Sequence, residues 1–206
     1  MVNYINIWGI PIFSNNIKIS EEIIDKLKLL PTERYKINNG YNSVEKYVLD
    51  KEEFISLKNN ILENLNIYLY DIIKIKKNTN FKLMNSWVNL HKKGDWAQEH
   101  EHCNSYISGI VYLDVFEDSG NLIFHKEKNW VNIFPKVPLI EVEEYSEINS
   151  QTWSYKPKNG DVYLFPSFLS HSVEKNLNEK NRYSLAFNFL PSGEFGSKDD
   201  INYMKI

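Results

Sequence analysis

The sequence predicts a mainly β protein with some α-helix: an antiparallel barrel or sandwich with two N-terminal helices packed on its outside. Helical periodicity is confined to the first 77 residues, and segments of strand character follow one another from residue 81 to residue 190. Aromatic residues make up 14% of the chain, including 13 Tyr and 11 Phe, which favours a sheet-rich interior. Glycine-containing turns separate several of the strand segments.

Length and composition indicate a single domain. With 206 residues, of which 42% are hydrophobic, the chain can bury a sizeable core. We expect one domain over residues 1–206, in which 1–77 provide an N-terminal strand and the supporting helices, 78–191 the barrel core, and 192–206 a loosely held tail.

Charge and cysteine usage exclude several classes of function. The net charge is -3 and Lys and Arg form no dense run, so neither nucleic acid nor a membrane surface is expected as a partner. One cysteine cannot form an internal disulfide, and the N-terminus lacks the pattern of a signal peptide. We therefore expect a cytoplasmic protein. The oligomeric state stays open, with a homodimer as one alternative.

The N-terminal part is expected to support the barrel. Residues 4–13 have the pattern of an edge strand. Ser20 is typical of an N-cap, and the short helix after it ends before the next proline. Residues 32–43 are rich in turn formers and are expected to connect two helices. Asp50 can cap the second, longer helix, in which apolar residues recur every three or four positions as far as Ile72.

The remaining predicted elements are strands, and their alternation provides the walls of a barrel. They cover residues 81–90, 97–102, 106–113, 121–124, 130–134, 139–142, 151–155, 161–165 and 182–190.

The histidines suggest a metal site. In a strand, successive side chains point to opposite faces, so His100 and His102 share one face while Glu101 points away. If the segment that carries His171 lies opposite them, three imidazoles converge and leave the other positions of a metal open. Three ligands on one face are what an iron centre that activates oxygen needs, although the usual set is two histidines and a carboxylate.

A second candidate site begins at Arg182. Of the 24 basic residues only Arg34 and Arg182 are arginines, and an arginine among lysines can mark a need for a planar, bidentate donor. Taken at period two, one face of the strand 182–190 carries Arg182, Ser184, Ala186 and Asn188. This face is polar but small, so it could bind a carboxylate and still leave room for a ligand. The alternative is a surface ion pair.

Other reactive side chains are expected to be less important. His91 and His125 are expected on the surface, with contact to a substrate as the alternative. Glu99 is expected to be solvated or paired, and Cys103 to be a small buried hydrophobic residue.

The chain resembles the 2-oxoglutarate and Fe(II)-dependent oxygenase superfamily, and within it a small prolyl-hydroxylase-like family. The likeness is strongest between residues 87 and 190, and it rests on the ordered combination of residues 100–102, 107–113, 119–122, 159–167, 171 and 182–188. It implies a double-stranded β-helix, which is a jelly-roll or cupin-like barrel.

The resemblance also implies site residues and an activity. It assigns iron to His100, His102 and His171, and the distal carboxylate of 2-oxoglutarate to Arg182 and Ser184, with Tyr112 as a further contact. The implied enzyme is a 2-oxoglutarate-dependent Fe(II) dioxygenase that hydroxylates a C–H bond of an unidentified small-molecule or peptide substrate. It would convert 2-oxoglutarate and oxygen to succinate and CO2.

One departure from the superfamily concerns His102, because the usual residue at that position is Asp. Three neutral imidazoles leave a ferrous site one unit more positive than two histidines and a carboxylate do. Two alternatives therefore stay open: a three-histidine, cupin-like metal enzyme, such as a thiol dioxygenase, that uses no 2-oxoglutarate, and a non-catalytic barrel that binds a metal or a carboxylate.

Overall fold

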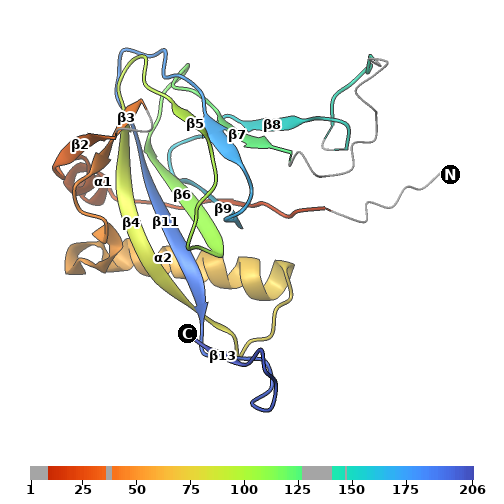
Figure 1. Ribbon diagram of the computed structural model, residues 1–206. Coiled ribbons are helices and arrows are strands. Elements are labelled where there is room, and N and C mark those ends of the chain that lie inside the picture. Colours follow the sequence, from red (N-terminus) through yellow and green to blue (C-terminus); the bar gives the residue numbers. More distant parts are fainter. Residues whose placement is uncertain (1–8, 36–38, 127–140, 147) are drawn as a thin grey trace.

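The computed structural model of the chain describes residues 9–35, 39–126, 141–146 and 148–206, and these residues form a mainly β structure (Figure 1). The N-terminal elements are β1 (Phe13–Asn16), α1 (Glu21–Lys28), β2 (Thr32–Tyr35), β3 (Gly40–Ser43), the short helices η1 (Val48–Asp50) and η2 (Glu52–Phe54), α2 (Ile55–Asn66) and the π-helical turn η3 (Ile67–Ile72). The later elements are β4 (Asn80–His91), β5 (Ala97–His100), β6 (Ile107–Asp114), β7 (Leu122–His125), β8 (Thr152–Tyr155), β9 (Asp161–Pro166), β10 (His171–Val173), β11 (Arg182–Ser192), β12 (Glu194–Phe195) and β13 (Met204–Lys205).

The described strands form two main sheets. The larger has seven strands in the order β1-β9-β6-β11-β4-β3-β2, and the smaller has four in the order β5-β10-β7-β8. All ladders within these two sheets are antiparallel. Helices cover one side of the larger sheet and the smaller sheet lies on the other (Figure 1). This is the predicted jelly-roll class with outer helices.

Two hydrophobic clusters hold these layers together. The first joins the helices to the larger sheet and includes Leu27 of α1, Ile61 of α2 and Phe187 of β11. The second lies between the two sheets and includes Phe124 of β7 and Phe165 of β9. The interior of the barrel is therefore lined by the larger sheet's second face and by the smaller sheet.

The first predicted helix is confirmed and the second begins later than predicted. Ser20 caps α1 and accepts a hydrogen bond from the backbone N–H of Ile23 at 3.4 Å. Asp50, expected as the cap of the longer helix, ends η1 instead, and α2 begins at Ile55. The stretch before α2 is instead occupied by the short helices η1 and η2, which place Leu49 and Phe54 in the core. The Leu49 N–H donates to Ser86 Oγ at 2.8 Å.

Residues 32–43 were expected to be a connection, and this prediction is wrong. They contain the hairpin strands β2 and β3, and β3 pairs with β4 at the edge of the larger sheet. Turn-forming residues adopt strand structure here because β4 offers an open edge for pairing. Of the predicted strand over 4–13, only its last residue, Phe13, is in a strand among the described residues.

The barrel strands match the prediction with shifts of one or two residues at most ends. The predicted strand 130–134 lies outside the described residues, as does most of 139–142, whose described residues 141–142 form no strand. The predicted strand 97–102 ends at His100, so His102 lies just beyond β5. In the described part of the chain, no helix is long and apolar enough to span a bilayer.

Candidate metal centre and anion pocket

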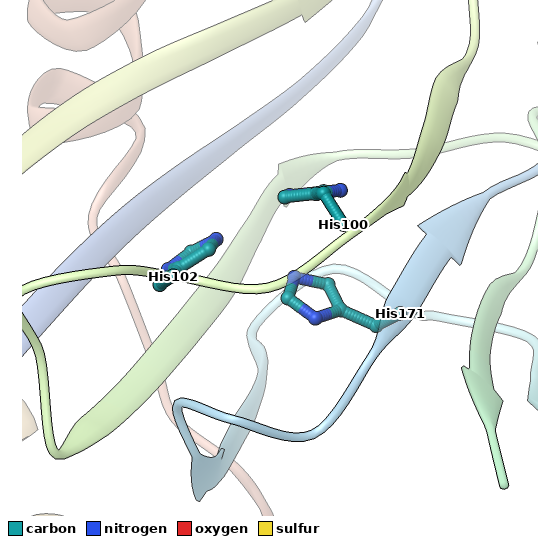
Figure 2. Close-up of side chains that lie close together, drawn as sticks. All are labelled: His100, His102 and His171. Carbon is teal, nitrogen blue, oxygen red and sulfur yellow. The ribbon is translucent and has the colours of Figure 1, made fainter. Parts of the chain in front are cut away.

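Three histidine side chains meet inside the barrel. His100 ends β5, His102 lies in the segment after it, and His171 begins β10 opposite His100. One ring nitrogen from each lies within 4.8 Å of the other two, and Figure 2 shows the three rings turned toward one another. The fold thus brings together the three residues that the sequence suggested as one cluster.

Backbone carbonyls fix the orientation of two of these rings. His100 Nδ1 lies 2.7 Å from the carbonyl oxygen of Gln98, and His171 Nδ1 lies 2.9 Å from that of Leu169. A carbonyl only accepts, so Nδ1 carries the proton in both rings. The lone pair of a neutral imidazole is then on Nε2, where it is available to a metal.

A side-chain network orients the third ring. His102 Nδ1 lies 2.7 Å from Asn188 Oδ1, and the amide nitrogen of Asn188 donates to Asn85 Oδ1 at 2.9 Å. The Ser108 hydroxyl also donates to Asn188 Oδ1, at 2.7 Å, and lies 2.8 Å from Ser167 Oγ. Because Asn188 presents its oxygen, His102 also carries its proton on Nδ1 and keeps Nε2 free.

Burial favours the neutral form of His102 and His171. The pKa of His102 is lowered to about 4, mainly by burial and also by the neighbouring His100, whereas the hydrogen bond to Asn188 acts in the opposite direction. Burial, followed by the proximity of His100 and His102, holds the pKa of His171 well below its usual value. Neutral imidazoles are the form that binds a metal, and three of them suit iron, zinc, copper or nickel.

A cavity extends from the histidines along the inner face of β11. Its lining includes His100, His102 and His171 at one end and Arg182 and Ser184 at the other.

Arg182 is almost fully buried at the far end of this cavity. Its side chain has 1% of its surface exposed. Nη1 donates to the carbonyl oxygens of Ser119 at 2.9 Å and Gly120 at 3.3 Å, and Nη2 lies 2.6 Å from His91 Nδ1. All of these partners are neutral acceptors.

Two buried polar atoms near each other have no partner. Among the described residues, only Arg182 Nε and the Tyr112 hydroxyl are buried side-chain atoms without a hydrogen bond. Burial raises the pKa of Tyr112, and the positive charge of Arg182 opposes this rise. No described carboxylate forms an ion pair with Arg182. A buried cation beside an unpaired hydroxyl is costly, so this end of the cavity is suited to an anion.

Ser184 lies on the same inner face as Tyr112 and Asn89, because the three are opposite one another on β11, β6 and β4. The Asn89 amide nitrogen donates to Ser184 Oγ at 3.4 Å. Asn89 Oδ1 is held by the Trp87 indole N–H at 2.9 Å and by the Asn42 amide at 2.6 Å. The hydroxyl of Ser184 therefore retains its own proton for a ligand.

His91 was expected on the surface, and this prediction is wrong. It is buried and lines the same cavity, because it ends β4 directly opposite Arg182. The sequence does not show that the end of β4 pairs with the start of β11. The one signal for the burial of His91 was its position at the end of a strand that faces the barrel interior.

The other side chains lie away from the cavity. His125 is half-buried and its Nε2 lies 2.8 Å from Ser172 Oγ. Glu99 accepts a hydrogen bond from the Ser170 hydroxyl, as expected for a paired residue. Cys103 is exposed, contrary to the expectation of burial, because it lies in the turn after the histidine pair.

Several solved structures share this fold at low sequence identity. The epimerase SnoN from nogalamycin biosynthesis superposes with a TM-score of 0.63 at 12% identity, covering 93% of this chain and 83% of SnoN. HygX from Streptomyces hygroscopicus, solved with nickel, 2-oxoglutarate and hygromycin B, gives 0.58 at 14% identity, with 87% and 82% covered. A prolyl-4-hydroxylase from Pseudomonas putida gives 0.56 at 14% identity, with 87% and 92% covered. This chain has the double-stranded β-helix fold of these structures.

No curated protein matches the sequence. One family model does, under the description "Putative 2OG-Fe(II) oxygenase", and it matches residues 85–188, just over half of the chain. The matched segment runs from the inner-facing residues of β4 to Asn188, and so contains all three histidines, Tyr112 and Arg182. The chain belongs to the 2OG-Fe(II) oxygenase family, whose cofactors are Fe(II) and 2-oxoglutarate.

Proposed function

We propose that the protein is a 2-oxoglutarate-dependent dioxygenase that hydroxylates a C–H bond of its substrate. In this proposal Fe(II) is bound by His100, His102 and His171, and the distal carboxylate of 2-oxoglutarate by Arg182, Ser184 and Tyr112. The observation that carries the proposal is the pairing, in one cavity, of three Nε2 lone pairs with a buried arginine that has no anionic partner among the described residues.

The proposed binding of Fe(II) rests on the three imidazole rings and on the hydrogen bonds that orient them. All three rings have Nδ1 committed to an oxygen acceptor, so each offers one nitrogen in a fixed direction (Figure 2). Hydrogen bonds of this kind orient metal ligands and raise their basicity. Three protein ligands leave further coordination positions for a chelating co-substrate and for oxygen.

The proposed contact between Arg182 and the distal carboxylate of 2-oxoglutarate rests on the N–H groups of Arg182 that have no partner in the part of the chain that the structure describes. Arginine has five N–H groups. Two on Nη1 are used by Ser119 and Gly120, and one on Nη2 by His91, which leaves the Nε–H and one Nη2–H. These belong to adjacent nitrogens of a planar group and match the two oxygens of a carboxylate. Tyr112 and Ser184 add hydroxyl donors on the same face.

When bound, iron and 2-oxoglutarate supply the activation of oxygen, and the expected co-products are succinate and CO2. The residues of the chain hold and orient these groups. The Asn188 oxygen keeps the proton of His102 on Nδ1, away from the metal. The small side chain of Ala186, between Ser184 and Asn188 on the inner face of β11, leaves space for the body of the co-substrate. The surrounding apolar wall, including Phe165 and Leu122, limits the access of water.

His102 gives this site a distinctive charge. With three neutral ligands, an Fe(II) ion and a doubly negative 2-oxoglutarate sum to zero, whereas a carboxylate ligand would leave one negative charge. We expect this to strengthen the binding of the anionic co-substrate and to make iron oxidation harder.

The substrate is proposed only as a small molecule or a peptide. The neighbours with this fold include an epimerase and a prolyl-4-hydroxylase, so the fold does not decide the outcome of the reaction. At the hairpin side, the cavity is lined by Tyr35, Tyr41 and Trp87. Their aromatic surfaces are the proposed contact for the substrate.

The proposal is tested by anaerobic titration of the protein with Fe(II) and then 2-oxoglutarate. We expect the weak visible charge-transfer band of the chelate, followed by succinate when oxygen is admitted. His171→Ala should abolish iron binding, since only two of the three proposed ligand nitrogens remain. The matched control is His125→Ala, which removes a histidine that contacts Ser172 and Glu99 and should leave iron binding unchanged.

Each alternative predicts a different result. Iron binding without the band would indicate a three-histidine enzyme that uses no 2-oxoglutarate. A band without succinate, with or without added substrates, would indicate a barrel that binds but does not turn over. Once a substrate is found, a product that gains one oxygen atom supports hydroxylation, and a product of unchanged composition or with two hydrogens fewer contradicts it.

A further inference from the structure

His91 makes an unusual contact with the buried arginine. It is 6% exposed, and its Nδ1 lies 2.6 Å from Arg182 Nη2. The two residues end β4 and begin β11, directly opposite each other in the ladder. Nothing in the proposed function requires a histidine here, since the co-substrate would be bound by Arg182, Ser184 and Tyr112.

The contact fixes the protonation state of His91. A guanidinium has only donors, so His91 Nδ1 must accept, and the proton of the ring is on Nε2. A protonated ring would bring two cations together inside the protein. Burial, followed by the charge of Arg182, accordingly lowers the pKa of His91 to about 3. The imidazole is therefore a permanently neutral acceptor at physiological pH.

The hairpin holds the ring from the other side. Gly40 begins β3, and a Cβ atom added to it would lie 2.7 Å from His91 Cδ2 and 2.8 Å from His91 Nε2. Any residue other than glycine at position 40 would therefore displace the His91 ring. His91 is thus clamped between the backbone of β3 and the guanidinium of Arg182.

We propose that His91 is the positioning residue of the co-substrate anchor, and that it thereby sets the preference of the site for a 2-oxo acid with a second, distal carboxylate. This rests on the proposed function. His91 occupies one N–H of Nη2 and, with the carbonyls of Ser119 and Gly120 on Nη1, restricts the guanidinium to one plane. The edge formed by Nε and the second Nη2–H then faces the ligand.

Removing the imidazole of His91 should weaken the binding only of ligands that have a distal carboxylate. Without the imidazole, a donor of Nη2 is left unpaired and the guanidinium can turn toward the vacated space, so its edge no longer matches the carboxylate. A ligand without a distal carboxylate does not use this edge. Its affinity should not depend on His91.

The experiment compares two ligands in anaerobic Fe(II) titrations of the full chain. 2-Oxoglutarate has the distal carboxylate, and 2-oxobutyrate has the same chelating end without it. For His91→Leu we expect the affinity for 2-oxoglutarate to fall by about ten- to a hundredfold, with iron affinity and the weak 2-oxobutyrate binding unchanged. His91→Gln, whose amide oxygen can accept from Nη2, should recover part of the loss. His125→Leu is the matched control and should change neither ligand.

Two outcomes would overturn the inference: an equal fold-loss of affinity for both ligands, or no loss for either. Should His91→Leu fail to fold, Gly40→Ala tests the same clamp by pushing the ring from behind, and it should produce the same selective loss. An unchanged ratio in that variant also contradicts the inference. A wild-type protein that gives no band with 2-oxoglutarate would instead overturn the proposed function itself, which separates the two failures.

Discussion

The hydrogen bonds that Nδ1 donates determine what the three histidines can do. A His-x-His pair on a strand is a weak indicator by itself, and the structure adds that each ring is oriented by an acceptor: the carbonyls of Gln98 and Leu169 and the amide of Asn188. Asn188 was expected on the small polar face of its strand, but not as the partner of His102. The sequence could not reveal this partner because the two residues are 86 positions apart.

Arg182 is the residue for which a conservative change should be most informative. Arg182→Lys keeps the charge and loses the planar edge, so we expect the affinity for 2-oxoglutarate to fall by about tenfold or more while iron binding is retained. The measurement is the anaerobic titration with each ligand. Arg34→Lys, a change at the only other arginine, is the control, because Arg34 is exposed on the hairpin. Equal losses of iron and 2-oxoglutarate would argue against the anchor.

Strand β11 separates the core from the cavity. Leu185, Phe187 and Phe189 pack in the cluster shared with the helices, whereas Ser184 and Ala186 line the cavity. The sequence predicted this division correctly, because a strand alternates with a period of two and the two sets differ in polarity.

Gly109 of β6 has a packing role on the helix side of this sheet. An added Cβ would lie 2.3 Å from Phe187 Cε2 and 2.6 Å from Leu164 Cδ2. The Phe187 ring and the Leu164 side chain are both buried, so neither can move freely. We expect Gly109→Ala to lower the free energy of unfolding by about 1–3 kcal/mol, as measured by urea denaturation. Combining it with Phe187→Leu should recover part of the loss; a neutral effect of Gly109→Ala would contradict this packing.

At the scale of the whole molecule, closure of the two sheets creates both sites. His100 and His171 meet because β5 and β10 are neighbours in the smaller sheet, and Arg182 reaches the cavity because β11 is in the middle of the larger one. The N-terminal hairpin, which was expected to be a loop, completes the wall behind His91. Its residues become strands only because an edge of the larger sheet is available.

Buried histidines should make the metal-free protein sensitive to acid. The pKa of His91 is lowered to about 3 and that of His102 to about 4, and that of His171 lies well below its usual value. Between these values and about 6.5 the unfolded chain binds protons that the folded chain does not, so the free energy of unfolding falls as the pH falls. Ordinary Asp and Glu side chains titrate near pH ~4, at the lower end of this window, so the histidine effect is measured above about pH 4.5.

We expect a loss of several kcal/mol between about pH 7 and about pH 4.5, measured by urea denaturation of the metal-free protein. His91→Gln removes one of the groups and should flatten the dependence. Stability that is constant over this range would contradict the burial of neutral histidines.

The sequence by itself determined the barrel class, most of its strands, the grouping of His100, His102 and His171, and the special character of Arg182. Strand alternation predicted the shared face of His100 and His102 and the small polar face that begins at Arg182, whereas the inclusion of His171 was implied by the resemblance to the oxygenase superfamily. Only the tertiary structure decided that residues 32–43 form a hairpin, that His91 is buried against Arg182, and that Asn188 orients His102. Each of these depends on pairing between strands that are far apart in the sequence, and such pairing follows from packing of the whole sheet rather than from any one segment.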